Sequence, residues 1–289
     1  MSEININVPS IFQRDDLSWF RYAETRRSRP VDMAGNVNDD PRVLNPETHA
    51  LLKSPLPFEE WVRIEKQATD ARIFALKSVL GVSTLARLRV AHGTDVISLN
   101  DAIDTTTGNI AVTDRPFFDA SILSTPDMAS MIPPADCIVA TAVYPSERIV
   151  SQIHIGIRGL ARGIAPQVLG QLELLGANPE DALIYLSPHA QGGFQLNAAE
   201  TEEITGIIDE GSRDRKQEFD AHTYEGIDHL PIMDLTEFTL DQLAKAGVPP
   251  RQIQVSPQNT LTDPTLYSDL AKQEKGFTGR FGVVAGIGK

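Results

Sequence analysis

The chain has 289 residues, of which 41% are hydrophobic and 22% charged, a composition typical of a globular protein that buries a full core. Its formal net charge of −13 argues against a general binder of nucleic acid or of anionic membranes, because basic faces meet those partners. No apolar run approaches the roughly 18 residues that a membrane span requires, so we expect no membrane partner.

The N-terminus and the cysteine content bear on the compartment. The first residues, MSEININVPS, include an acidic side chain and lack the basic and apolar regions of a secretory signal. Cys137 is the single cysteine of the sequence, so it cannot form an internal disulfide, and a free thiol persists best in a reducing compartment. Both observations predict a cytoplasmic protein.

The N-terminal third is expected to contain a loop region followed by a long helix. Residues 32–57 are rich in Asn, Asp and Pro, which indicates turns and one short helix. Residues 58–80 carry apolar side chains at helical spacing and are followed by Gly81, which predicts an amphipathic helix that stops there. Residues 85–99 then form two strand-like pieces that meet at His92 and Gly93.

Strands and helices alternate irregularly in the rest of the chain. Apolar or β-branched runs predict strands at 119–123, 138–144, 148–155, 182–187, 252–256 and 281–287. Helices are predicted at 159–176, with a bend at Pro166, and at 233–247. The polar stretch 209–231 shows little periodicity and is expected to be an exposed excursion.

This order of elements predicts an α+β protein. Strands that come in adjacent pairs between a few long helices favour a layered sandwich over strict β-α-β alternation. No shift in composition marks a boundary, so we expect one domain over residues 1–289.

A short turn separates the strand after Cys137 from the strand that contains His154, so the two strands are expected to be antiparallel neighbours. With Pro145 and Ser146 as a two-residue loop, Cys137 falls directly opposite His154. Directly opposite Cα atoms lie about 4.5 to 5.5 Å apart, so the thiol and the imidazole would meet or share one metal ion. A three-residue loop would instead put them on opposite faces of the sheet.

The segment IGIRGL follows His154 and leads the chain from a strand into a helix. The first turn of a helix offers unpaired N–H groups, and Arg158 adds a guanidinium suited to phosphate or carboxylate. An anion site is one interpretation of this pattern. A purely structural turn is the other.

His92 lies at the end of an apolar strand and next to a glycine, as His154 does. One Cys and two His would give zinc three protein ligands and one open position, which is the arrangement of catalytic zinc sites. From the spacing alone, the alternative is a small buried thiol and two hydrogen-bonded core histidines.

Three motifs in this order resemble those of the laccase-domain family, first called multicopper polyphenol oxidoreductases and later recognised as zinc-dependent purine nucleoside phosphorylases with adenosine deaminase activity. The matching positions are His92, Gly93 and Val96, then Ala135, Asp136 and Cys137, then His154, Gly156, Arg158 and Gly159. Further similarity follows in residues 117–137, 177–190 and 252–287, whereas residues 1–90 are divergent.

The resemblance implies a layered fold with mixed and antiparallel sheets, shared with cysteine-dependent deamidases. It implies that His92, Cys137 and His154 are the metal ligands and catalytic centre, with zinc favoured over copper although these ligand types accept both. Zinc lowers the pKa of bound water toward about 7, which would serve deamination.

The remaining site assignments follow from the same resemblance. Purine nucleosides and phosphate would be the substrates, and Arg158 and Gly159 would bind the anion. Asp136 would orient a ligand or transfer a proton, or would only accept hydrogen bonds from the backbone.

Departures from the family pattern bear on substrate and activity. Ile157 replaces a tryptophan beside the third ligand, Ile155 replaces an alanine, and Asn259 stands where a cysteine is usual. The run SDLAKQ replaces a basic segment. These changes leave two rival hypotheses: a metal-free thiol hydrolase or deamidase that uses Cys137 and His154, and a degenerate homologue that binds a nucleotide or a partner without turnover.

Other histidines are expected to be structural or exposed, namely His49, His189, His222 and His229. No glycine-rich segment matches an ATP or NAD fingerprint. Multicopper oxidase chemistry would need more His and Cys ligands than these three.

Overall fold

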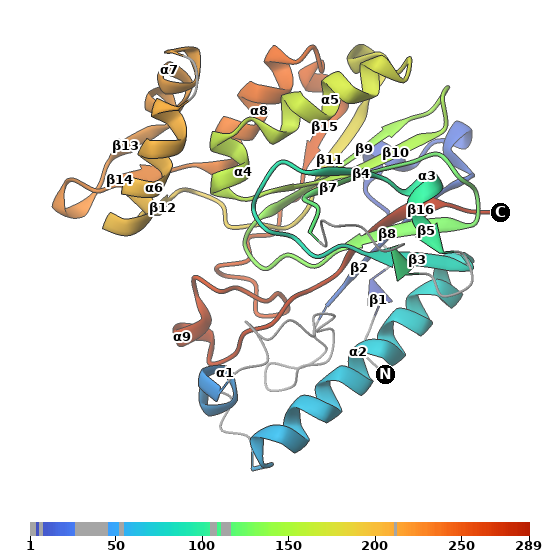
Figure 1. Cartoon of the computed structure of the whole chain (residues 1–289), viewed down its shortest axis with the longest axis horizontal. Helices are drawn as coiled ribbons and strands as arrows, with labels where there is room; N and C mark the ends of the chain where they lie inside the picture. Colours follow the sequence, from blue (N-terminus) through green and yellow to red (C-terminus); the bar gives the residue numbers. More distant parts are fainter. Residues whose placement is uncertain are drawn as a thin grey trace.

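The structure is a computed structural model that describes residues 4–5, 8–26, 46–51, 55–104, 109–110, 117–210 and 213–289. Two β-sheets lie face to face, and helices cover their outer faces (Figure 1). Both sheets contain parallel and antiparallel pairs. The α+β layered sandwich predicted from the sequence is therefore confirmed.

The first sheet has five strands, in the order β1 (Ile4–Asn5), β2 (Phe20–Thr25), β16 (Val283–Ile287), β8 (Met128–Ile132) and β3 (Thr84–Arg87). The second has six, in the order β15 (Ile253–Val255), β11 (Leu183–Leu186), β9 (Ile138–Tyr144), β10 (Ile149–Ile155), β7 (Ala120–Leu123) and β4 (Val96–Ser98). Two small sheets are formed by β12 (Phe194–Gln195), β14 (Pro231–Met233) and β13 (Thr223–Glu225), and by β5 (Ile103–Asp104) with β6 (Asn109–Ile110).

The longer helices are α2 (Phe58–Leu80), α5 (Ile164–Leu174), α6 (Ala198–Asp209), α7 (Arg213–Ala221) and α8 (Leu235–Lys245). Short helices are α1 (Pro46–Leu51), α3 (Leu99–Ala102), α4 (Ile157–Ala161) and α9 (Lys272–Lys275). Single 3-10 turns lie at Ser10–Phe12, Asp15–Leu17, Pro179–Asp181, Ile227–His229 and Pro250–Gln252. Across the described ranges, no helix has the length and apolarity to cross a membrane.

The central strands β9 and β10 are buried on both faces. On β9, alternate residues Ile138 and Ala140 face the helices, while Val139 and Val143 face the five-stranded sheet. Burial on both sides explains why these strands consist of nearly continuous apolar runs, the pattern that made them predictable.

A buried polar chain links the two sheets across this apolar interface. The Ser121 hydroxyl donates to Ser130 Oγ at 3.1 Å, and Ser130 donates to Gln152 Oε1 at 2.7 Å. Gln152 Nε2 in turn donates to the backbone carbonyl of Val283 at 3.1 Å. Each of these buried polar groups is hydrogen-bonded. This series of hydrogen bonds therefore fixes how the two sheets stack, and it leaves none of its own polar side-chain atoms unpaired.

Helix α2 covers the outer face of the five-stranded sheet, and α4, α5 and α8 cover the outer face of the six-stranded sheet (Figure 1). The predicted stop of α2 is confirmed: Gly81 adopts a left-handed conformation (φ 65°), and its N–H donates to Lys77 and Ser78 carbonyl oxygens. Glycine accepts this conformation without the steric cost that a side chain adds.

The predicted helix over 159–176 is interrupted at a different residue from the one expected. The chain forms α4 and α5, separated by Gly163 in a left-handed conformation (φ 75°). Pro166 lies in the first turn of α5, where its missing N–H breaks no intrahelical hydrogen bond. The bend predicted at Pro166 is therefore wrong, and the break is at Gly163.

The stretch 209–231 contains more regular structure than its polarity indicated. It includes α7 and β13, and β13 pairs with β14. Phe219 is buried in the helix-side core, whereas Lys216, Gln217 and Asp220 are exposed. One apolar anchor in so polar a helix leaves little periodicity in the sequence, which explains the missed helix.

Core packing under α2 can be tested with two residues of the same helix. Leu76 is fully buried and Phe74 is 75% exposed. Leu76→Ala is expected to lower the free energy of unfolding by about 2–5 kcal/mol, because it leaves a cavity in a packed layer. Phe74→Ala should change it by no more than about 0.5 kcal/mol. Urea titrations followed by circular dichroism measure both; equal effects would contradict the packing described here.

Candidate metal centre and pocket

The candidate site lies at one edge of the six-stranded sheet, where β4, β7 and β9 begin and β10 ends. His92 is in the loop before β4, Asp119 directly precedes β7, Cys137 directly precedes β9, and His154 is the penultimate residue of β10. The antiparallel and parallel pairings of these strands bring all four residues to the same edge. The sheet thus gathers residues that are far apart in the sequence.

The hairpin between β9 and β10 differs from the predicted register. Tyr144 pairs with Ile149, so the turn contains four residues, 145–148, instead of two. His154 pairs with Val139, and the predicted direct pairing of His154 with Cys137 is wrong. The shift is two residues, and an even shift keeps every side chain on its predicted face of the sheet.

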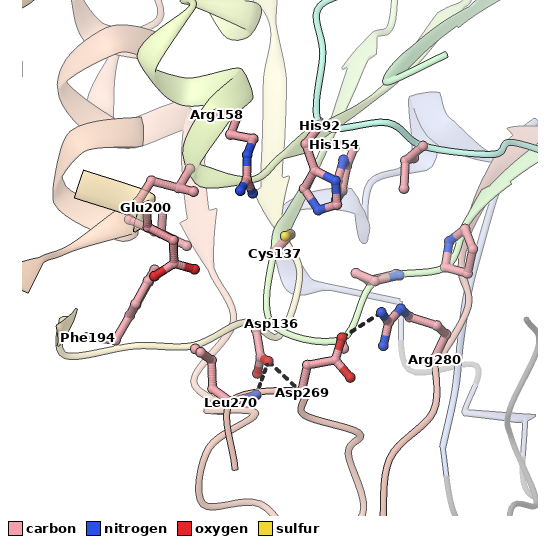
Figure 2. Close-up of a pocket in the computed structure, with 16 residues that line it drawn as sticks. His92, Asp136, Cys137, His154, Arg158, Phe194, Glu200, Asp269, Leu270 and Arg280 are labelled. Carbon is pink, nitrogen blue, oxygen red and sulfur yellow. Dashed lines mark hydrogen bonds and ion pairs between the residues drawn. The ribbon is translucent and has the colours of Figure 1, made fainter. Parts of the chain in front are cut away.

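The side chains of His92, Cys137 and His154 nevertheless converge. Their ligand atoms all lie within 4.8 Å of one another, and the two imidazole rings are 4.9 Å apart between centroids. Figure 2 shows the rings side by side above the Cys137 sulfur. A Cβ atom at Gly156 would lie 2.8 Å from His92 Cδ2 and 3.1 Å from Cys137 Sγ, so the absence of a side chain there leaves room for the trio.

Asp119, which is buried, organises two of these three side chains. Its carboxylate accepts hydrogen bonds from the backbone N–H groups of Ala91, His92 and Gly93, at 3.2, 2.8 and 2.8 Å. It also lies 2.9 Å from His154 Nδ1, which leaves Nε2 as the ring nitrogen available to a ligand. One carboxylate therefore fixes both the His92 loop and the ring orientation of His154.

His92 itself has an unusual backbone. Its φ is 60°, in the left-handed region that residues with a side chain rarely adopt. Besides the Asp119 contacts, Arg162 Nη1 donates to the His92 carbonyl at 3.1 Å. Gly159 is buried beneath this loop, and a Cβ there would lie 3.1 Å from the Gly93 carbonyl oxygen. Arg162 and Gly159 thus support the loop that carries His92.

The site favours a charged thiol and imidazole. Burial raises the pKa of Cys137, but the charge of His154 and hydrogen bonds with His154 and His92 outweigh it and lower the pKa to about 6. Burial lowers the pKa of His154, but the Cys137 charge and the Asp119 hydrogen bond raise it to about 9. The metal-free site therefore holds a thiolate next to an imidazolium near neutral pH.

Asp136 ties the pocket to the C-terminal part of the chain. Its carboxylate accepts hydrogen bonds from Thr260 Oγ1 at 2.7 Å and from the backbone N–H groups of Asp269 and Leu270 at 2.7 and 2.9 Å. Both carboxylate oxygens are thus engaged with the chain itself. This arrangement matches the expectation that Asp136 accepts backbone hydrogen bonds beside a strand.

Arg158 extends from α4 toward the pocket, as Figure 2 shows, and is held by α6. Its Nε and Nη2 donate to the two carboxylate oxygens of Glu203 at 2.7 and 2.6 Å. This bidentate hydrogen bonding raises the pKa of Arg158. Within the described residues, no group accepts a hydrogen bond from Arg158 Nη1.

A pocket of about 210 Å³ lies in front of the trio (Figure 2). It is lined by backbone and side-chain atoms of Val90, His92, Pro133, Pro134, Ala135, Asp136, Cys137, His154, Ile157, Arg158, Phe194, Glu200, Leu235, Asp269, Leu270 and Arg280. Apolar side chains make much of the wall, and charged groups are concentrated at a few points. A small, partly apolar organic ligand fits this description.

Sequence reasoning did not single out several residues of this site. The sequence assigns no role to Asp119, although an aspartate immediately before a predicted strand is an available signal. Phe194, Glu200 and Arg280 join the pocket through folding alone. No local pattern distinguishes them from other residues of their segments.

The other histidines lie away from the trio. His189 is buried and hydrogen-bonded to the Ser187 carbonyl and Thr236 Oγ1, His222 contacts Asp241, and His49 contacts the Leu56 carbonyl. His229 is exposed and contacts Glu225. His189 is buried and His229 exposed, as expected, whereas His49, for which the sequence indicates no partner, and His222, expected at the surface, are half-buried and have local partners.

The departures from the family pattern fall in different places. Ile157 lines the pocket, as do Asp269 and Leu270 of the SDLAKQ run. Asn259 instead hydrogen-bonds Gln191 and the N–H of Leu261, and it is not among the lining residues. The Ile157 and SDLAKQ changes alter the pocket wall, whereas the Asn259 change joins two loops.

The donor set fits a metal ion such as zinc. Ligand atoms that share a zinc ion at its usual bond lengths are about 3.3 to 3.8 Å apart, so the observed separations require only small inward movements. Two imidazoles and a thiolate match the preference of zinc, and the Asp119 contact to His154 is the carboxylate–histidine arrangement found behind metal ligands. Among the residues that the structure describes, His92, Cys137 and His154 are the one group of three or more His, Cys, Asp or Glu side chains spaced closely enough to share a metal ion.

The fold is a layered α/β sandwich, and His92, Cys137 and His154 form a candidate metal-binding group at one edge of its six-stranded sheet. The chain belongs to the multi-copper polyphenol oxidoreductase laccase family, whose model matches residues 61–288. The family inferred from the motifs is thus confirmed. No curated protein matches the chain.

Solved structures share the fold. The hypothetical protein YfiH of Bacillus licheniformis superimposes with a TM-score of 0.70 at 17% identity, covering 93% of this chain and 92% of that one. YlmD from Geobacillus stearothermophilus gives 0.63 at 18% identity, with 97% and 100% covered. Protein NMB0706 of Neisseria meningitidis gives 0.64 at 18% identity, with 94% and 96% covered. At these identities the likeness shows the fold alone.

The space at Gly156 can be tested through metal affinity. Gly156→Ala places a methyl group against His92 and Cys137, so zinc affinity is expected to fall by about tenfold or more. Gly206→Ala, in α6, is the matched control, because a Cβ there meets nothing within 4 Å. Zinc affinity is measured by competition with a chromogenic chelator. An unchanged affinity in Gly156→Ala would contradict the packing of the trio.

The charge state of Cys137 can be tested by alkylation of metal-free protein. Because the thiolate is the reactive form, the rate should rise with pH through a midpoint near 6 instead of near 9. His154→Gln removes the main stabilising charge and should move the midpoint upward, whereas His229→Gln, at an exposed site, should not. Mass spectrometry after timed iodoacetamide treatment gives the rates; a wild-type midpoint near 9 would refute the thiolate assignment.

Proposed function

We propose that the protein is a zinc-dependent purine nucleoside phosphorylase with an accompanying adenosine deaminase activity. The observation that carries this proposal is the convergence of His92, Cys137 and His154 beside a small, partly apolar pocket, in a chain of this family. Three protein ligands leave one position open, which is typical of catalytic zinc sites. We favour zinc over copper on the same ligand set, although both metals accept it.

Each residue has a role in the proposed phosphorolysis. Bound zinc would supply Lewis acidity beside the pocket. Arg158 would present Nη1 to a phosphate oxygen, and the Glu203 contact would keep the guanidinium in place. An oxygen of hydrogen phosphate would form a bond to C1′ of the ribose while the bond from C1′ to the base breaks, and the proton lost by the phosphate would end on the departing base. Gly159 would serve this site by supporting the His92 loop.

Asp136 would act on the pocket by positioning. Both of its oxygens already accept hydrogen bonds from residues 260, 269 and 270, so it would hold Leu270 and Asp269 in the wall. Proton transfer by Asp136 would require these hydrogen bonds to break. A positioning role therefore accounts better for its surroundings.

A second candidate is a thiol hydrolase or deamidase. Asp119, His154 and Cys137 form a carboxylate–imidazole–thiol chain, with 2.9 Å between Asp119 and His154 Nδ1. In this alternative Cys137 would be the nucleophile and His154 its base. This thiol mechanism gives His92 no role, and for that reason the thiol hydrolase is the second candidate.

The proposed function is tested by chromatography of adenosine, inosine and methylthioadenosine incubated with zinc-loaded protein, with and without phosphate. We expect phosphate-dependent release of free base, and a loss of more than about a hundredfold in Cys137→Ala because a metal ligand is removed. Absence of any base or deaminated product would refute the proposal and favour a binding protein without turnover.

Chelation separates the two candidates. A zinc enzyme should lose activity when the metal is removed and regain it when zinc is restored. A thiol hydrolase should remain active after chelation and lose activity after alkylation of Cys137.

A further inference from the structure

A loop near the C-terminus forms one part of the pocket wall. Residues 256–271 connect β15 to α9, and Asp269 and Leu270 of this loop line the pocket. Leu266 and Tyr267 of the same loop are fully buried. Backbone carbonyl groups buried in a loop need hydrogen-bond donors from elsewhere, because a loop has no helix or sheet ladder to supply them. The shape of this wall therefore depends on the groups that donate to the loop.

Lys275, the last residue of α9, is such a donor. Its ammonium donates hydrogen bonds to the backbone carbonyl oxygens of Asp263 at 2.7 Å and Leu266 at 3.0 Å, and to that of Thr260. These three oxygens form a carbonyl cage around the charge. An ammonium has three N–H groups and no acceptor, so three carbonyl oxygens match its hydrogen-bonding capacity. Residues 260–266 thus fold around one positive charge.

The core fixes the position of Lys275. The aromatic ring of Phe277 lies 5.7 Å from the ammonium nitrogen, within the range of a cation–π contact. Phe277 and Tyr267 are buried and pack edge to face, with 6.0 Å between their ring centroids. A Cβ at Gly279 would lie 2.7 Å from the Tyr267 ring, so the chain after α9 passes directly against that ring. The ammonium is therefore held between the carbonyl cage and a packed aromatic pair.

Thr260 connects the carbonyl cage to the pocket. Its carbonyl oxygen accepts a hydrogen bond from Lys275, and its hydroxyl donates one to Asp136 Oδ1 at 2.7 Å. Asp136 Oδ2 in turn accepts hydrogen bonds from the N–H groups of Asp269 and Leu270, at 2.7 and 2.9 Å, as the dashed lines in Figure 2 show. A displacement of Thr260 would therefore be passed through one carboxylate to two residues of the wall.

We propose that Lys275 is a positioning residue of the pocket. Its ammonium shapes the loop through the carbonyl cage, and Thr260 and Asp136 transmit this shape to the wall. Lys275 is not among the residues that line the pocket, so it would act without touching a substrate. This role concerns the shape of the wall, so it goes beyond the proposed function and applies to either candidate reaction.

Hydrogen exchange of the full-length protein measures how firmly the wall is held. Lys275→Met keeps an unbranched apolar stem and removes the ammonium. Exchange in peptides that cover Asp269 and Leu270 should then speed up by about tenfold or more, because hydrogen bonds to a charged group are lost. Peptides of β9 and β10 should keep their wild-type rates. Faster exchange everywhere to the same degree would show a general loss of stability and overturn the proposal.

Lys272→Met is the matched control. Lys272 belongs to the same short helix and also places a positive charge near Asp269. Within the described residues, no carbonyl oxygen accepts a hydrogen bond from Lys272, so the substitution removes a comparable charge and leaves the carbonyl cage intact. Exchange in the wall should therefore stay within about twofold of the wild type. Equal effects of the two substitutions would assign the result to charge alone and overturn the role of the cage.

Chemical rescue separates a positioning charge from lost packing. Lys275→Ala leaves the three oxygens of the carbonyl cage and the space beside them. Ammonium or methylammonium chloride should restore wild-type exchange in the wall, whereas tetramethylammonium chloride of equal ionic strength, which has no N–H donor, should not. If Lys275→Ala folds only in ammonium chloride, recovery of folded protein is the same readout.

The pattern of rescue decides the proposal. Restoration by ammonium and methylammonium alone would support it. Failure of both to restore the wall, or equal restoration by all three salts, would overturn it. All of these measurements are made without a substrate, so their outcome does not depend on whether the protein cleaves nucleosides.

Discussion

The site depends on the carboxylate of Asp119 more than on any other group. It accepts hydrogen bonds from three consecutive backbone N–H groups, at 91 to 93, and contacts Nδ1 of His154. Burial raises the pKa of Asp119, but the contacts with His154, Gly93 and Ala91 lower it on balance, so the group stays charged. A charged, fully hydrogen-bonded carboxylate joins the loop before β4 to β7 and β10, and thereby fixes two of the three candidate metal ligands with one side chain.

The two-layer sheet makes this arrangement rigid. Strands β9 and β10 are enclosed by the second sheet on one face and by helices on the other, so their ends cannot shift independently. Cys137 and His154 lie at those ends, and Gly156 next to them leaves the space they need. Rigid elements hold a site more closely than loops do, which suits a centre that requires three side chains to meet.

The elements predicted best from the sequence are those whose side chains follow a single simple pattern of burial. Helix α2 showed its 3.6-residue period and its terminal glycine, and β9 and β10 showed continuous apolar runs. Strand β2 was not predicted, because Arg21 and Glu24 interrupt its apolar residues. Glu24 is buried there with hydrogen bonds from Tyr22 and Arg26, a pairing that only the folded chain supplies.

The sequence predicted that His92, Cys137 and His154 lie together, but it did not predict the opposite wall of the pocket. The order of the motifs indicated that His92, Cys137 and His154 form one site. The two-residue error in the predicted turn left their side chains on the predicted face of the sheet, because the side-chain period of a strand is two. The wall of the pocket formed by Phe194 and Glu200 depends on how a segment distant in sequence packs against the rest of the fold. Phe194 and Glu200 reach the pocket only because α6 packs beside α4 and β12 pairs with β14, and nothing in their own sequence indicates this.

His92 provides the strongest structural argument between metal and thiol chemistry. A thiol hydrolase needs only Cys137, His154 and Asp119, and a second imidazole beside the thiolate would then have no task. Yet His92 occupies a left-handed backbone conformation that costs free energy, and hydrogen bonds from Arg162 and to Asp119 maintain it. Strain of this kind persists where the position of a side chain matters. Because the ligand atom of His92 lies within 4.8 Å of the other two, the proposed coordination of a shared metal ion would explain why the chain holds it there.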